Sequence, residues 1–196
     1  FYLLHGIGGD EEAWITQGRT AQILDNLIAQ GKAQPMIVVM TNGNIAMEAA
    51  PLETSTGYDI PTMGLPKTME GSFETAFPEV VKFIDKTYRT IPQKRSRAIA
   101  GLSMGGFHSK FISQNNPDMF NYIGLFSAAI GVSNATSPIY QDNEKKLATL
   151  FSKNNKDYRQ FLDQHGYKYT YMETTGGHIW RNWRIYLTEF VPLLFK

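Results

Sequence analysis

The sequence predicts an α/β fold: a three-layer αβα sandwich around a mostly parallel, doubly wound sheet. Short apolar runs typical of strands buried on both faces alternate with segments of helical periodicity, which is the order that a parallel sheet requires. Glycine-rich loops directly follow two of these runs, at residues 5–9 and 101–106. With 196 residues, of which 42% are hydrophobic, the chain is long enough for one globular core. We therefore expect residues 1–196 to form a single domain.

The chain begins with an apolar run at residues 1–4 that already has the character of a buried strand. We therefore expect the native chain to start before Phe1, with the sheet incomplete at this end and any signal peptide outside the sequence. The loop at residues 5–9 lets backbone N–H groups approach a ligand closely. A phosphate cradle and a plain turn have the same pattern. We expect a structural role for His5, which stands beside this loop.

Helices and strands alternate between the two glycine-rich loops. The pattern predicts a helix over residues 20–31 and a buried strand over residues 36–40. Residues 41–71 are rich in Gly, Pro, Thr and Asn, and a loop of this length in a compact domain is expected to form part of a site rim. Apolar residues at helical spacing over residues 73–88 predict another helix with a buried face.

Residues 101–105, Gly-Leu-Ser-Met-Gly, match the G-x-S-x-G pattern of a nucleophile elbow. A strand at residues 95–100 ends there, the chain turns sharply at Ser103, and a helix begins. The turn crowds the backbone on either side of the serine, where only glycine lacks the Cβ that would clash. The alternative is a glycine-rich turn with an ordinary serine, but the strand before it and the helix after it favour a catalytic nucleophile.

His178 is the candidate general base. Residues 167–173 alternate as a strand does, and residues 174–178 form a loop before the final helix. In hydrolases with this elbow, the histidine follows the last strand, and its neutral imidazole takes the proton of the serine. If the pKa of His178 has its ordinary value, activity should fall at acid pH with a midpoint near roughly 6 to 7.

The same architecture supplies an oxyanion hole from two backbone N–H groups, one after the nucleophile and one in the early loop. Here these groups belong to Met104 and Ile7. Together the residues predict a serine carboxylic-ester hydrolase that works through an acyl-enzyme and needs no cofactor and no metal ion.

The alternation of strands and helices fails between residues 126 and 167. Residues 144–151 and 157–163 both have the pattern of helices, and the five residues from Ser152 to Lys156 contain no apolar run. Two consecutive helices imply that one strand is absent, together with the turn where the acid of the triad belongs. An intact peptide bond at every step from Ser152 to Lys156 would contradict a segment left out there.

Four stretches resemble the esterase-D and feruloyl-esterase branch of the α/β-hydrolases, carbohydrate esterase family 1. They are residues 3–9, 65–69, 101–107 and 176–180, with Trp183 completing the last. The resemblance implies the α/β-hydrolase fold. It also implies plant cell-wall esters as substrates, with feruloyl or acetyl groups on xylan.

The site residues that the resemblance implies are the nucleophile Ser103, the base His178, and Ile7 and Met104 as oxyanion donors. In that family the acid is an aspartate on a Gly-x-x-Asp-like turn, and no position of this sequence matches it. The role is therefore given to none of the nearest carboxylates, which belong to Asp157, Asp163 and Glu173.

For the substrate, Trp14 and Trp180 would supply an aromatic floor under a feruloyl ring, together with the loop at residues 41–71. The alternative is that both tryptophans belong to the core. A general carboxylesterase, a thioester hydrolase and a non-catalytic sugar-binding relative are the competing functions. A triad acid would distinguish an esterase from the sugar-binding relative, because a binding module does not need one.

The composition excludes several classes of partner. Nineteen basic and eighteen acidic residues leave a formal charge of +1 with no basic run, which argues against nucleic acid and anionic membranes. No stretch approaches the ~20 apolar residues of a membrane span. The absence of cysteine excludes disulfides and a thiol nucleophile. The expected partner is a small-molecule or oligosaccharide ester, and the expected location is secreted or periplasmic.

Overall fold

The computed structural model describes residues 1–43, 72–130 and 144–196, with only the backbone course for residues 144–153. Most of the expected rim loop at residues 41–71 lies outside these ranges, as does the motif at residues 65–69. The described part shows the three layers that the sequence predicts.

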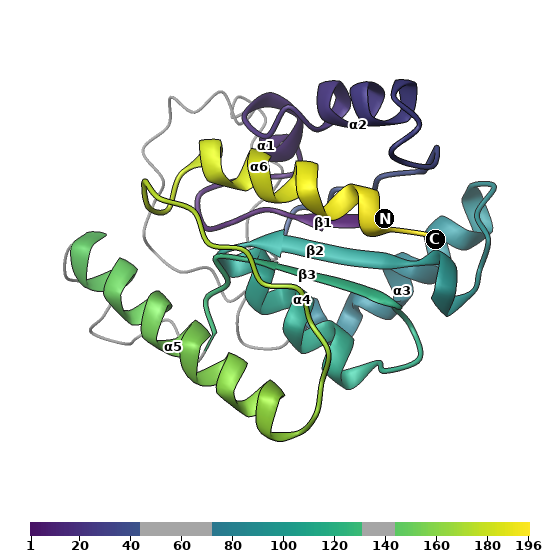
Figure 1. Ribbon diagram of the computed structural model, residues 1–196. Helices are drawn as coiled ribbons and strands as arrows, with labels where there is room; N and C mark the ends of the chain where they lie inside the picture. The colour runs from purple at the N-terminus through teal and green to yellow at the C-terminus, as the bar shows by residue number, and fades with distance from the viewer. Residues whose placement is uncertain (44–71, 131–143) are drawn as a thin grey trace.

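The described sheet is parallel, in the order β1-β2-β3 (Figure 1). It consists of β1 (Tyr2–Leu4), β2 (Ala98–Leu102) and β3 (Tyr122–Phe126). Ile99 lies opposite Tyr2 on one side and Ile123 on the other. Every residue of β1 and β2 is buried, which explains their continuous apolar sequence.

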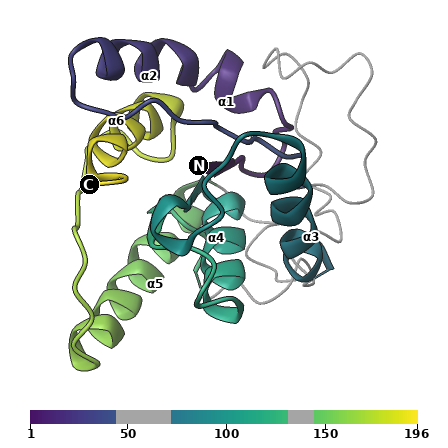
Figure 2. The ribbon, with the colours of Figure 1, turned by 90° about the vertical axis from the view of Figure 1, so that its right-hand side faces the viewer.

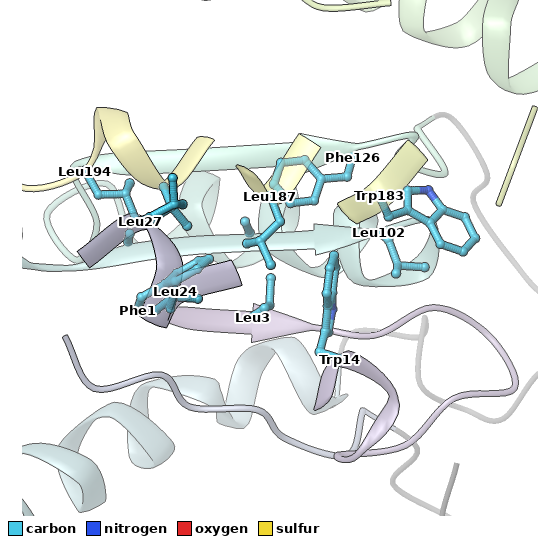
Figure 3. Close-up of a cluster of buried hydrophobic side chains, with 13 residues drawn as sticks. Phe1, Leu3, Trp14, Leu24, Leu27, Leu102, Phe126, Trp183, Leu187 and Leu194 are labelled. Atoms are coloured by element: carbon cyan, nitrogen blue, oxygen red, sulfur yellow. The ribbon is translucent and has the colours of Figure 1, made fainter. Parts of the chain in front are cut away.

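Successive residues of these strands point to opposite faces, and each face has its own hydrophobic cluster. On one face, Leu3 and Ala100 pack with α1 (Ala13–Thr16), α2 (Thr20–Ala29) and α6 (Trp180–Phe190). Figure 3 shows Trp14 of α1 and Leu187 of α6 converging on this side of the sheet. A short 3₁₀ turn, η4 (Val191–Leu193), completes this layer.

The opposite face is covered by α3 (Ser72–Thr87) and α4 (Met104–Asn115). Tyr2 and Ile99 point into this layer, against a row of α3 side chains that includes Phe77. Another 3₁₀ turn, η2 (Lys94–Ser96), leads into β2. Figures 1 and 2 show α2 beside α6 on one side of the strands and α3 with α4 on the other.

Two strands that the sequence predicts do not form in the structure, so these two predictions are wrong. Residues 36–40 make one bridge to β1, in which the Leu3 N–H donates to the Val39 carbonyl at 2.9 Å, and they remain partly exposed. Residues 167–173 alternate in sequence but form no strand and are exposed. A strand needs a neighbouring strand to pair with, and the period-2 pattern carries no information about whether one is present.

The expected break between two helices at Ser152–Lys156 is also wrong. A single helix, α5 (Glu144–Gln164), runs through these residues, and the amides of Asn154 and Asn155 donate to the Ile130 and Ala128 carbonyls. Among the described residues between β3 and residue 167 there is still no strand, as the sequence predicts.

Candidate active site

Ser103 occupies a sharp turn between β2 and α4. Its φ of 52° and ψ of −112° lie outside the regions that L-residues normally adopt, at a cost of about 1–3 kcal/mol. Backbone hydrogen bonds hold this conformation: the Ser103 N–H donates to the Phe126 carbonyl at 2.9 Å, and the Ser103 carbonyl accepts from Ala129 at 3.0 Å. A strained backbone conformation at the candidate nucleophile is the geometry expected of a nucleophile elbow.

The glycines of the elbow are required by close approach, as the sequence predicts. A Cβ on Gly101 would overlap the backbone of Gly105. A Cβ on Gly105 would lie 2.5 Å from the His5 carbonyl oxygen and would also overlap the Leu4 carbonyl. The start of α4 is therefore packed directly against the end of β1.

The early glycine loop lies against the nucleophile. A Cβ on Gly6 would come within 3.4 Å of the Ser103 Cβ. The loop is a turn closed by the Gly9 N–H, which donates to the Gly6 carbonyl at 3.1 Å, with Gly8 at a φ of 75°. Ile7 stands inside this turn, and Met104 begins α4, where helix N–H groups favour negative charge.

His5 has a structural role in the same loop. Its Nε2 accepts from the Gly43 N–H at 2.9 Å, so its proton is on Nδ1, which donates to the Gly6 carbonyl at 2.7 Å. The side chain is buried, and desolvation lowers its pKa. His5 therefore joins the glycine loop to the segment after residue 40 as a neutral side chain.

His178 follows two glycines with positive φ, 100° at Gly176 and 83° at Gly177. Its ring meets the Trp183 indole edge-to-face, with centroids 4.8 Å apart. Although the residue is exposed overall, the packing around its ring removes enough water to lower the pKa to about 4. His178 is therefore a neutral proton acceptor well below neutral pH.

Two contacts place the His178 loop at the same edge of the sheet as the elbow. The indole N–H of Trp183 donates to the Ser127 Oγ at 3.4 Å, and Ser127 directly follows β3. The carbonyl of Phe126, one residue earlier, accepts the Ser103 N–H. In Figure 1 the chain enters α6 on the side to which the strand arrows point.

A family model described as "Putative esterase" matches residues 1–164. The chain belongs to this esterase family.

Known relatives of this esterase agree with the family. An endo-1,4-beta-xylanase/feruloyl esterase of Xylanibacter ruminicola is 40% identical over 126 residues, which are 64% of this chain but only 16% of that protein. A ferulic acid esterase of known structure has a TM-score of 0.74 and 28% identity, over 98% of this chain and 82% of the other. A CE1 ferulic acid esterase from Anaeromyces mucronatus, solved with ferulic acid, has a TM-score of 0.77 and 19% identity, over 99% and 78%.

These comparisons confirm the resemblance to the feruloyl-esterase branch and the α/β-hydrolase fold. Together they support a serine esterase. The chain spans only 16% of the length of the Xylanibacter ruminicola protein.

The esterase has its tryptophans mainly in the core, which is the alternative that the sequence left open. Trp14 is 1% exposed, and its Nε1 donates to the Leu4 carbonyl at 2.9 Å. Trp180 is partly buried and packs edge-to-face on Trp14 and on Trp183. In this structure Trp14 is therefore closed to a substrate ring, and a floor of both tryptophans is not formed.

The described part of the esterase gives no residue the role of the acid. Asp157 and Asp163 lie on α5, and Glu173 accepts from the Tyr171 hydroxyl at 3.0 Å. Desolvation alone accounts for the pKa shift of His178. Within the described ranges there is also no cluster of three or more His, Asp or Glu side chains suited to a metal ion, and no helix with the length and hydropathy that crossing a membrane requires.

Sequence reasoning missed Asn182, which is buried in the first turn of α6 and donates two hydrogen bonds into the His178 loop. A polar residue inside the apolar stripe of an amphipathic helix is the signal that would have revealed it. It also missed Ser127, whose φ of 45° is unusual for serine and which no sequence pattern marks.

Proposed function

We propose that this esterase hydrolyses carboxylic esters of plant cell-wall carbohydrate, feruloyl or acetyl groups on xylan, through an acyl-enzyme. The strained turn at Ser103 is the observation that carries the reaction type, because a φ of 52° at a serine between a strand and a helix is the conformation expected of a nucleophile elbow. The substrate is supported by the relatives, one named as a xylanase and feruloyl esterase and one solved with ferulic acid.

In the proposed mechanism, Ser103 Oγ attacks the ester carbonyl carbon while His178 takes the hydroxyl proton. The backbone N–H groups of Ile7 and Met104 stabilise the oxyanion, with help from the dipole of α4. The protonated His178 then gives its proton to the departing alcohol. Water attacks the acyl-Ser103 carbonyl with His178 again as base, which releases the carboxylic acid and restores the hydroxyl.

The low pKa of His178 fits this role in one respect and limits it in another. A neutral imidazole is available to accept a proton at any pH above about 4. An imidazolium formed during attack is stabilised by a partner carboxylate in a complete triad, and none is assigned here.

The proposal extends to the setting of the reaction. Residues 1–196 form one catalytic domain that takes a small-molecule or oligosaccharide ester and acts in a secreted or periplasmic location. The near-balanced charge of the chain supports a neutral carbohydrate ester over a polyanion.

The test compares the release of product from methyl ferulate, acetylated xylan and p-nitrophenyl acetate. Ser103→Ala should abolish release from all of them, whereas Ser113→Ala, a serine farther along α4 whose hydroxyl donates only to the Lys110 carbonyl, should keep it. Turnover of p-nitrophenyl acetate alone would make the protein a general carboxylesterase. Failure of a fluorophosphonate probe to label Ser103 would indicate a non-catalytic relative.

A further inference from the structure

We propose that Asn182 is a positioning residue that fixes the place of His178 by hydrogen bonding to the loop that carries it. The inference rests on the proposed function, in which His178 is the base. It concerns residues 174–178, which we call the His178 loop.

The His178 loop has little packing of its own to hold it. Thr175, Gly176, Gly177 and His178 are all exposed, and the two glycines adopt φ values of 100° and 83°. Glycine has more backbone freedom than any other residue, so such a segment is costly to order. A base on this loop needs a fixed anchor, because a misplacement of about 1 Å can lower a rate by two orders of magnitude.

Asn182 supplies that anchor from α6. Its side chain is 1% exposed, and its Nδ2 donates to the Gly177 carbonyl at 2.7 Å and to the Thr175 carbonyl at 3.1 Å. These two carbonyls flank Gly176, so both sides of the flexible turn are tied to one amide group. The Ile179 N–H also donates to the Gly177 carbonyl, at 3.2 Å.

The chemistry of the interaction requires an amide. Both partners are carbonyl oxygens, so the side chain must offer two N–H donors. The Oδ1 of Asn182 has no hydrogen-bond partner within the described part of the chain, which shows that the donor end makes the useful contacts. An aspartate of the same shape would place a carboxylate against two carbonyl oxygens.

Trp183, the next residue, packs against the imidazole ring of His178 and restricts its movement. Its indole meets the His178 imidazole at an interplanar angle of 87° and is itself held by the Ser127 Oγ and by Trp180. The first turn of α6 therefore fixes the backbone of His178 through Asn182 and confines its side chain through Trp183.

Asn182→Asp separates this role from a general role in helix stability. Asn182 is the third residue of α6, where an acidic side chain favours the helix dipole. If Asn182 served only to stabilise α6, its variants would lower the free energy of unfolding, but the protein that remains folded would keep its kcat. Positioning predicts instead that kcat for p-nitrophenyl acetate falls roughly ten- to hundredfold while KM stays within about twofold.

Asn116→Asp is the matched control. The Asn116 amide also donates to a carbonyl, that of Ile112 at 2.9 Å, but at the far end of α4. Asn182→Ser serves as a second variant, which replaces the two N–H donors with one shorter hydroxyl donor and adds no charge. All variants are compared as folded protein, after thermal unfolding has shown a cooperative transition.

Amide hydrogen exchange at Ile179, whose N–H donates to the same Gly177 carbonyl as Asn182, gives a readout that does not depend on activity. We expect faster exchange there in Asn182→Asp and Asn182→Ser, with Asn116→Asp unchanged. Unchanged exchange in both Asn182 variants would overturn the proposal, as would a loss of kcat no larger than that of Asn116→Asp. If the unmodified protein neither turns over esters nor labels with the fluorophosphonate probe, the proposed function fails, and hydrogen exchange still decides the anchoring.

Discussion

His108 of α4 and Glu74 of α3 meet in the interior, with Nε2 3.4 Å from Oε1 and neither side chain exposed to solvent. This contact joins the elbow helix to the helix beside it on the same face of the sheet. Removing one member of such a buried pair takes away a partner of the other, whereas replacing both with apolar residues is often tolerated.

We therefore expect Glu74→Leu to lower the free energy of unfolding by about 3 kcal/mol. Adding His108→Leu to this variant should restore a large part of the loss, because the remaining polar group is then gone. Urea unfolding of the two single variants and the double variant completes the thermodynamic cycle. Additive losses would show that the two side chains do not stabilise each other.

Gly105→Ala should destabilise the protein by more than about 2 kcal/mol and reduce labelling of Ser103, because the added Cβ meets the backbone of β1. Gly31→Ala is the control, since it has open space around it and only a positive φ of 67°. That control should cost about 1 kcal/mol and leave labelling intact. Equal effects would mean that close packing at Gly105 is unimportant.

Ser103→Gly should be more stable than Ser103→Ala by about 1 kcal/mol, although both variants lose ester hydrolysis. Glycine adopts the φ of 52° without the steric cost that a Cβ brings. Thermal unfolding of the two variants side by side measures this difference. A more stable alanine variant would show that the elbow is not strained.

The acid limb of the pH profile should have its midpoint below 6.5, displaced towards 4. Only neutral His178 accepts the serine proton, and desolvation lowers its pKa to about 4. An ordinary histidine pKa would instead give a midpoint of roughly 6 to 7. Initial rates for p-nitrophenyl acetate from pH 3.5 to 8 measure the limb, and a midpoint at or above 6.5 contradicts the desolvation.

The same shift affects stability in a defined direction. Because the pKa of His178 is lower in the folded protein, the unfolded chain binds more protons between about pH 4 and 6.5. The free energy of unfolding therefore decreases as the pH falls through this window. In His178→Gln this part of the pH dependence should be absent, which urea unfolding at pH 4.5 and 7 would detect.

The elbow could be predicted from sequence because its determinants are local. Gly101, Ser103 and Gly105 impose the turn themselves, and the strand and helix on either side follow from short-range patterns. The strand expected at residues 167–173 failed because pairing depends on a neighbour, and no local pattern reports one. Trp14 was ambiguous for a similar reason, since a tryptophan in the core and one in a substrate floor have the same sequence.

Within the described part of the chain, β3 is an edge strand of the sheet. Ile123 is 48% exposed, and the backbone of β3 pairs on one side only, with β2. An uncovered apolar strand edge is a template on which another polypeptide can add a strand. Within the described residues, this edge of β3 is therefore the place where a further strand would pair.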